Sequence, residues 1–419
     1  MIKFNVEAQA LHRALNLAGV VPPTSEDNKP AGYLFVVSGE TCSIFSRDSK
    51  AKHEARTSFH ISEAEGEGRF MLPSEAVSAL KLIKEDQTIQ FEASSEDDVF
   101  RIRYSFGSSG SSEKVSFDPR AFGSFEKDIT KALEEPEKEF PVKALQIALG
   151  TTKTWLPKPT DKIEQPHLRT IKIFGQSDDP AVAKGDGFMF ATNGQVACFY
   201  RCTAFLGKEL LVPEQHLRLI ESFLSRSEGR AVKIYSLPNK SYMVNESGDI
   251  VGWNTISADH KKFSYLSKND EIVLMVTPKD IIDQLKFVKA DMASDKFKVR
   301  MAYDPTKHSL QFSHVDGNLS GSSLPVSCEL IKQTLETEEQ ILMSIHVDFM
   351  LKLFEGLKGN SVEFRVKIIP ASSGYPRPRY LFRTIDQYSL TTEGQVVATI
   401  EGEETLTECQ VTRLAPGID

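Results

Sequence analysis

The sequence predicts an α+β fold in which one small strand-and-helix unit recurs six times along the chain. Three observations predict it. A short apolar strand followed by a helix returns about every 65–70 residues, the helices carry an apolar stripe at helical spacing, and alternating strands fill the gaps. A unit of this size cannot bury its apolar face alone. We therefore expect consecutive units to pair into three similar domains, each with two helices packed on antiparallel sheets.

Each copy opens with a strand of four or five mostly apolar residues and continues into a helix. The six strands are expected at residues 3–6, 69–72, 139–142, 209–212, 272–276 and 341–345. The helices that follow are expected to end near residues 19, 84, 149, 225, 289 and 358. Prolines at 73, 213 and 278 stand at expected helix starts, where the missing N–H has no helical partner to lose.

The helices share an apolar stripe with spacings of three and four residues. Leu217, Ile220 and Leu224 form such a stripe in the fourth copy, and Leu285 and Val288 belong to one in the fifth. These spacings place the apolar side chains on one helix face, which predicts packing of every helix on a sheet.

Alternating strands follow the even-numbered helices, at residues 88–92, 231–235 and 361–366. Pairing the units predicts three domains, at 1–130, 139–267 and 270–419. The charged, proline-containing segment 131–138 is interpreted as the linker between the first two domains, and a second junction is expected at 267–270.

Composition excludes several classes of protein. No apolar run approaches the ~20 residues of a membrane span, and the start of the chain lacks a signal-peptide pattern. Five scattered cysteines indicate a reducing compartment rather than a disulfide framework. We therefore expect a soluble, cytoplasmic protein. The net charge of −8 argues against a protein that is basic all over, but it allows a ring that is acidic outside and basic inside.

Motifs that would carry catalysis are missing from the sequence. It has no phosphate-binding loop, no His-Glu-x-x-His zinc motif and no Gly-x-Ser-x-Gly nucleophile motif. The acidic groups at 96–98 and 401–404 fall at expected strand turns, where solvated hairpin tips are favoured over a metal site. We expect no enzyme activity, no cofactor and no metal.

Six related units in one chain suit either a closed pseudo-symmetric ring or a tandem array of α+β domains. Residue-level similarity favours the ring, because the whole chain resembles the bacterial DNA sliding clamp, the beta subunit of DNA polymerase III. Residues 191–195 (Ala-Thr-Asn-Gly-Gln) resemble the Ala-Thr-Asp-Gly-His turn of that family. Residues 117–122 resemble the segment closing its first domain, and residues 411–414 resemble its C-terminal Met-Arg-Leu ending.

This resemblance implies the DNA-clamp fold and a head-to-tail homodimer that encircles duplex DNA without reading its sequence. Helices would line the hole, and sheets would form the outer wall. Basic residues on or beside the helices are then candidates for phosphate contact. They are Arg13, Lys81, Lys84, Lys143, Lys153, Arg218, Arg226, Lys279, Lys286, Lys289, Lys352 and Lys358. The loop bases Lys29, Lys162 and His167 join them because they match or lie nearest to DNA-contacting positions of the family.

The resemblance also implies a pocket between the second and third domains that binds short peptide motifs of the polymerase and the clamp loader. The matching residues are Leu168, Thr192, Gly194, Gln195, Val196, Ala197, Phe263, Tyr265, Val411, Thr412, Arg413 and Leu414. Gln195 and Val196 replace a His-Arg pair of the family, so the peptide specificity is expected to differ. The alternative function is a clamp-like adaptor that assembles proteins without encircling DNA.

Overall fold

The computed structural model describes residues 1–24, 32–96, 99–116, 123–157, 165–174, 187–193, 196–227, 229–256, 270–290, 292, 298–314, 323–355, 357, 360–369, 379–389, 399–400, 403–404 and 406–416. The chain forms two compact units. The first combines Met1–Gln146 with Gln215–Ile256, and the second combines Ile147–Glu214 with Ser257–Asp419. The division into three domains stays a prediction.

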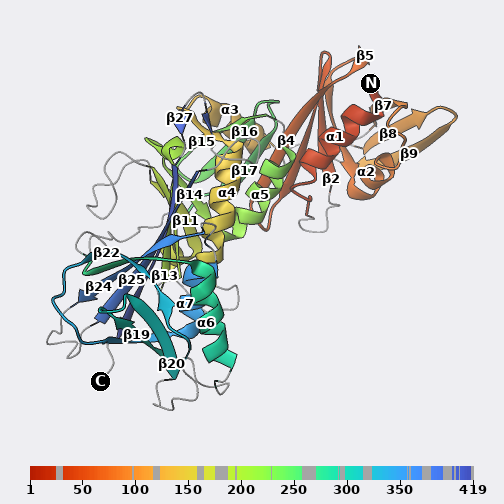
Figure 1. Cartoon of the computed structure of the whole chain (residues 1–419). Coiled ribbons are helices and arrows are strands. Elements are labelled where there is room, and N and C mark those ends of the chain that lie inside the picture. The colour runs from red at the N-terminus through yellow and green to blue at the C-terminus, as the bar shows by residue number, and fades with distance from the viewer. Residues whose placement is uncertain are drawn as a thin grey trace. The chain divides into compact units, whose positions relative to one another are not determined.

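Two antiparallel sheets build the first unit (Figure 1). One has the order β5-β1-β7-β8-β9, with β1 Ile2–Glu7, β5 Ser62–Glu65, β7 Thr88–Glu96, β8 Val99–Phe106 and β9 Ser109–Ser116. The other has the order β10-β15-β16-β17-β4-β3-β2-β6, with β10 Lys138–Pro141, β15 Ala231–Ser236, β16 Lys240–Asn245, β17 Ile250–Asn254, β4 His53–His60, β3 Thr41–Asp48, β2 Gly32–Ser38 and β6 Gly68–Pro73. The pairing of β4 with β17 therefore joins strands from the first and fourth copies in one sheet.

The core of the first unit lies between these two sheets. Phe4 and Phe91 come from one sheet, and Phe35 and Phe70 come from the other. Their rings stack with centroids 4.9 Å apart for Phe4 and Phe91 and 5.1 Å apart for Phe35 and Phe70. All four side chains are buried. Aromatic rings bury large apolar areas, so this cluster holds the sheets together.

Helices α1 (Ala8–Ala18), α2 (Ser74–Leu80), α5 (Leu217–Arg226) and the start of α4 (Val142–Thr152) belong to the first unit. Helix α2 ends four residues before its expected end. Lys81 is its C-cap, and the N–H groups of Leu82 and Ile83 bond three residues back, as in a tight turn. Helix α5 begins after a short 3-10 turn, η5 (Glu214–His216), rather than directly after Pro213.

One further helix, α3 (Gly123–Leu133), was not predicted from the sequence. The interpretation of 131–138 as a linker is therefore wrong at its start, because residues 131–133 close this helix. Side chains of α3 pack on Leu34, Phe45 and Tyr242. Helices α1 and α2 share a core with Phe35, which points to the opposite sheet face from Leu34. The eight-stranded sheet thus has α3 on one face and α1 and α2 on the other.

The second unit contains a nine-stranded sheet, a four-stranded sheet and a short β26–β27 hairpin. The nine-stranded order is β14-β11-β12-β13-β28-β25-β24-β18-β22, with β14 Leu210–Pro213, β11 Thr170–Phe174, β12 Phe188–Thr192, β13 Val196–Arg201, β28 Leu406–Pro416, β25 Arg379–Ser389, β24 Val362–Ile369, β18 Ile272–Val276 and β22 Glu329–Gln333. The four-stranded order is β21-β20-β19-β23, with β21 Val326–Ser327, β20 Ser309–His314, β19 Lys298–Asp304 and β23 Ile341–His346. The hairpin pairs Thr399–Ile400 with Glu403–Glu404.

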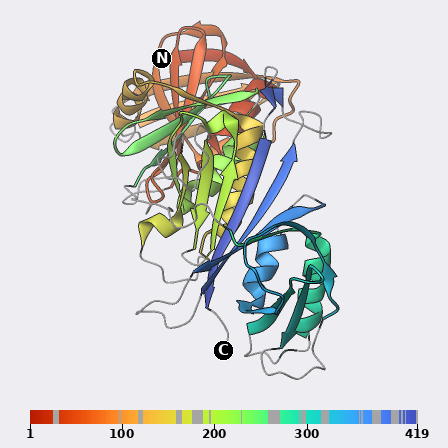
Figure 2. The ribbon, with the colours of Figure 1, turned by 60° about the vertical axis from the view of Figure 1, so that its left-hand side comes forward.

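The helices of the second unit are α6 (Pro278–Ala290), α7 (Val347–Glu355) and the end of α4. The short 3-10 turns are η2 Lys153–Trp155, η3 Pro166–Arg169 and η4 Thr203–Phe205. Helices α6 and α7 lie side by side in both views (Figures 1 and 2). The predicted α+β class and all six strand-and-helix copies are confirmed.

Candidate functional site

The helix face of the first unit carries six of the predicted DNA-contacting residues, including Arg226 at the end of α5. Arg13 lies on α1, Lys143 on α4 and Arg218 on α5, and all three are exposed. Lys81 and Lys84 lie in the turn that follows α2, and they are exposed as well. The sequence stripe placed the apolar side of each helix inward, so these charged side chains occupy the solvent side.

Three of the basic residues, Arg13, Lys81 and Arg226, gather where the end of α1 meets the end of α5. The Nη1 atom of Arg226 donates to the backbone oxygen of Asn16 at 2.6 Å. Burial lowers the pKa of Lys81, and the charge of Arg226 lowers it further. Arg13 donates from Nη2 to the Ser247 hydroxyl at 3.0 Å. Cations beside the last carbonyls of a helix are stabilised by its dipole, so α1 holds this cluster in place.

A groove of about 620 Å³ runs along this cluster. It is lined by Glu7, Gln9, Ala10, His12, Arg13, Asn16, Leu17, Glu85 and Arg226. Positive and negative groups both reach it. The arrangement therefore suits weak contact with a polyanion better than tight capture of one.

Two of the three basic residues of α6, Lys286 and Lys289, form ion pairs with α7, and the third, Lys279, is exposed at the start of the helix. Lys286 Nζ lies 3.4 Å from Glu355 Oε1, and Lys289 Nζ lies 2.6 Å from Asp348 Oδ1. Both lysines stay about half exposed, with side-chain exposures of 58% and 48%. The pairs reduce the positive field of this face. A DNA contact by either lysine stays a prediction.

The remaining candidates for DNA contact are scattered or undescribed. Lys153 lies in η2 and is exposed, and the half-buried His167 lies in η3. Lys352 lies on α7, but its side chain is outside the described part. Lys29 and Lys162 also lie outside the described residues.

Segments that carry residues of the predicted peptide pocket lie on three neighbouring strands of the nine-stranded sheet. In β12 and β13, Thr192 pairs with Ala197. In β13 and β28, Ala197 pairs with Thr412 and Val196 with Arg413. Helical turn η3, which contains the buried Leu168, contacts β11 and β12.

Several predicted pocket residues lack a described side chain. Gly194, Gln195, Phe263 and Tyr265 lie outside the described residues, and the side chains of Val411, Thr412, Arg413 and Leu414 do too. The backbone therefore brings together segments more than 200 residues apart, as the resemblance implies. The use of these residues as a pocket stays a prediction.

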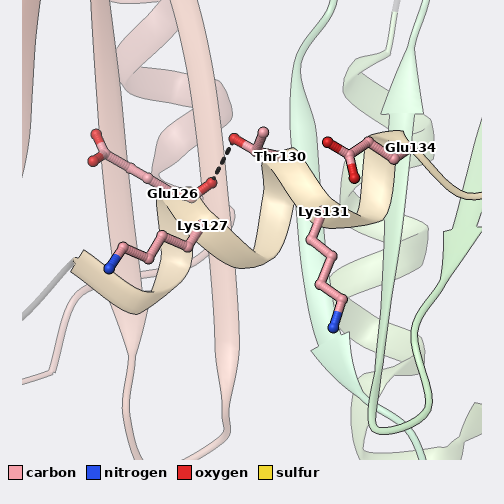
Figure 3. Close-up of a pocket in the computed structure, with 5 residues that line it drawn as sticks. All are labelled: Glu126, Lys127, Thr130, Lys131 and Glu134. Carbon is pink, nitrogen blue, oxygen red and sulfur yellow. Dashed lines mark hydrogen bonds between the residues drawn. The ribbon is translucent and has the colours of Figure 1, made fainter.

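The described ranges hold no group of three or more His, Cys, Asp or Glu side chains that could bind a metal ion. A shallow hollow of about 320 Å³ is lined by Glu126, Lys127, Thr130 and Lys131 of α3 and by Glu134, in the turn directly after this helix (Figure 3). Since one helix and the turn that follows it supply its walls, it is a charged helix surface rather than a ligand cavity. No helix in the described residues is long and apolar enough to cross a membrane.

Sequence patterns did not reveal the partners that fix the basic cluster. The Asn16 carbonyl and the Ser247 hydroxyl lie far from Arg226 and Arg13 along the chain. Only the approach of α1 to α5 and of β16–β17 brings them together. No local pattern in the sequence signals these two contacts.

Comparison with known proteins gave matches among solved structures alone. No family model and no curated protein matches this sequence. A DNA polymerase sliding clamp from Pseudomonas aeruginosa matches with a TM-score of 0.68 and 12% sequence identity, covering 100% of both chains. The Caulobacter crescentus sliding clamp matches with a TM-score of 0.68, 13% identity and 100% coverage of both chains. The DNA polymerase III beta subunit of Thermotoga maritima gives 0.60 and 12%, again over 100% of both chains. The chain therefore has, over its whole length, the fold of the bacterial DNA sliding clamp.

Proposed function

We propose that this protein is a DNA sliding clamp, a homodimeric ring without enzyme activity that encircles duplex DNA and tethers a polymerase. The observation that carries the proposal is the order in which the sheets join. In the eight-stranded sheet, β17 pairs antiparallel with β4. In the nine-stranded sheet, β28 pairs antiparallel with β13. In both cases the last strand of one predicted domain pairs with a strand from the first half of the preceding domain.

Two strands lack the sheet partner that this pattern of pairing between domains would give them. Within the described residues, β9 ends the five-stranded sheet and β21 ends the four-stranded sheet, so each has a neighbour on one side. Strand β9 is the last strand of the first predicted domain, and β21 belongs to the first half of the third. The same pattern pairs β9 of one chain with β21 of a second chain. Two such contacts close a ring of two chains, because a head-to-tail interface generates rings when its rotation closes.

Exposed apolar side chains in the same two predicted domains support this interface. Leu82, just after α2, is 85% exposed, and Phe287 on α6 is 58% exposed. Leu324, two residues before β21, is 74% exposed, and its N–H donates to Gln284 of α6 at 3.1 Å. Large exposed apolar groups of this kind are typical of protein interfaces. We propose that they are buried between the two chains.

The helix face then lines the hole. The cluster of Arg13, Lys81 and Arg226 contacts phosphates without reading bases, which permits sliding. The β12–β13–β28 region binds short peptides of the polymerase and the clamp loader. The chain is proposed to act in the cytoplasm, where the replication machinery of bacteria and their viruses works.

A threading experiment tests the proposal without a clamp loader. The protein is incubated with linear duplex DNA, so that rings can pass over the ends, and the DNA is then circularised with ligase. Gel filtration at high salt should show protein retained on the circle, because a threaded ring needs no electrostatic contact. Cutting the circle should release the protein.

Charge variants provide the matched controls. Lys81→Glu/Arg226→Glu should lower the amount threaded at low salt, since phosphate contacts weaken. Lys127→Glu/Lys131→Glu, on the opposite face of the sheet, should leave that amount unchanged. Equal loss of protein from circular and linear DNA at high salt would reject encirclement. A dimer with that behaviour would instead support the adaptor function.

A further inference from the structure

Two histidines from distant parts of the chain meet beside the seam where β4 joins β17. The Nε2 atom of His53, the first residue of β4, lies 2.6 Å from Nδ1 of His216, the last residue of η5. The two rings meet edge to face, with centroids 4.8 Å apart and an interplanar angle of 67°. His216 is fully buried, at 0% exposure. The contact therefore ties the strand from the first half of the chain to the start of α5.

The surroundings of the pair are poor in charge. Asp48, opposite His53 on β3, is the charged group that acts on the pair within the described residues, and it favours protonation of His53. From η5, the Gln215 amide lies 3.1 Å from Nε2 of His216. From β17, the Asn254 backbone hydrogen-bonds His216 and favours its protonated form.

Trp253 of β17 lies opposite His53 of β4. It pairs with His53 across the seam and is 1% exposed. Its indole Nε1 has no hydrogen-bond partner in the described part of the chain. The side chains around the two imidazoles thus offer few groups that could stabilise an added charge.

The distance between the two ring nitrogens limits how many protons the pair can hold. A hydrogen bond of 2.6 Å carries one proton between the two nitrogens. A neutral pair meets this requirement, and so does a pair in which one ring is protonated on its outer nitrogen. When both rings are fully protonated, two N–H groups and two positive charges face each other. The contact then cannot persist.

We propose that the His53–His216 pair is a proton-sensitive contact. It stabilises the pairing of β4 with β17 at neutral pH and breaks on acidification, which weakens that pairing. The proposal concerns the first unit alone and does not depend on ring formation or DNA binding. Full protonation of both rings separates η5 from the start of β4. The consequence is a loosening of the joint between the first and second predicted domains.

The direction of the effect follows from proton linkage. Burial lowers the pKa of His216 to about 4, and the neighbouring His53 contributes to this shift. Burial also lowers the pKa of His53. The unfolded chain therefore binds more protons than the folded one below about pH 6.5. Stability that is complete above that pH is lost progressively as the pH falls toward 4.

Tryptophan fluorescence gives a local test. The chain has two tryptophans, so Trp155→Phe leaves Trp253 as the single reporter, at the seam. In this background, urea unfolding is followed at pH 7 and pH 5. Between pH 7 and pH 5, the unfolding equilibrium constant of the Trp155→Phe protein should rise on the order of tenfold more than that of the same protein carrying His53→Gln/His216→Asn. His60→Gln, at the exposed other end of β4, is the matched control and should behave like the parent.

An NMR titration of the parent chain keeps the test decisive if the double variant does not fold. Among the nine histidines, two imidazoles should titrate clearly below the usual range, and the amides of β4 and β17 should lose exchange protection in parallel. Ordinary titration of all imidazoles near pH 6.5, or identical pH dependence in parent and double variant, would overturn the proposal.

Discussion

At the scale of single residues, the face of the eight-stranded sheet that packs on α3 contains a buried charged network. Glu54 is 3% exposed, and its two oxygens each lie 3.2 Å from Lys240 Nζ. The Tyr242 hydroxyl donates to Glu54 at 3.3 Å. Burial raises the pKa of Tyr242, and the carboxylate raises it further, so the phenol stays protonated as a donor. A buried carboxylate is tolerated here because it is paired and hydrogen-bonded.

Gly252 makes room for this network. A Cβ atom at this position would lie 2.6 Å from Cε1 of Tyr242. Gly252→Ala should therefore push the ring away from Glu54 and lower the free energy of unfolding by about 1–3 kcal/mol, as overpacking of a core does. Urea denaturation measures the change.

Gly150 offers the matched control for this substitution. It lies within α4 and would place a Cβ atom in open space. Gly150→Ala should be neutral or stabilise by up to about 1 kcal/mol, because alanine favours the helix. Equal destabilisation by both variants would show that the Tyr242 contact has no special role.

At the scale of elements, α3 shows where a charged composition misleads a prediction from sequence. The segment around it is rich in Lys and Glu, which suggested a linker. The helix nevertheless carries Phe125, Ile129 and Ala132 at helical spacing, and all three are buried on the sheet. Two ion pairs also connect α3 to strands of the sheet. Asp128 Oδ2 lies 2.9 Å from Lys240 Nζ of β16, and Glu126 Oε2 lies 2.7 Å from Arg69 Nη2 of β6.

The apolar stripe should contribute more to stability than these partly exposed ion pairs. Phe125 contacts Phe45 edge to face, with ring centroids 5.5 Å apart. Phe125→Ala should lower the free energy of unfolding of the first unit by about 3–5 kcal/mol, through lost burial and a cavity. Lys127→Ala, on the exposed face, should change it by less than about 0.5 kcal/mol. Circular dichroism in urea would reveal the difference, and comparable effects of both would contradict this account of α3.

At the scale of the whole molecule, the proposed ring depends on two sheet ends that lie far apart in sequence. Phe287→Asp places a charge where the second chain should cover an apolar ring. The charge would be buried without a partner, so the dimer should dissociate at micromolar concentration. Light scattering should then give the mass of one chain, 46.8 kDa, in place of twice that value.

Leu206→Asp controls for a general effect of surface charge. Leu206 is 45% exposed, in the turn between η4 and β14, and it belongs to neither of the sheets that end in β9 and β21. This variant should remain a dimer. A parent chain that is a stable monomer at the same concentration would reject the ring, whatever the variants do.

Periodicity in the sequence determined the repeat itself: six strands, six helices and the apolar face of each, because local spacing decides which side chains share a face. The tertiary structure decided the rest. It joined β4 to β17 and β13 to β28, folded α3 onto a sheet and brought His53 to His216. It also gathered Arg226 and Lys81 at the end of α1. These contacts join residues far apart in the chain, and no local pattern records which strand edge or helix end a segment will meet.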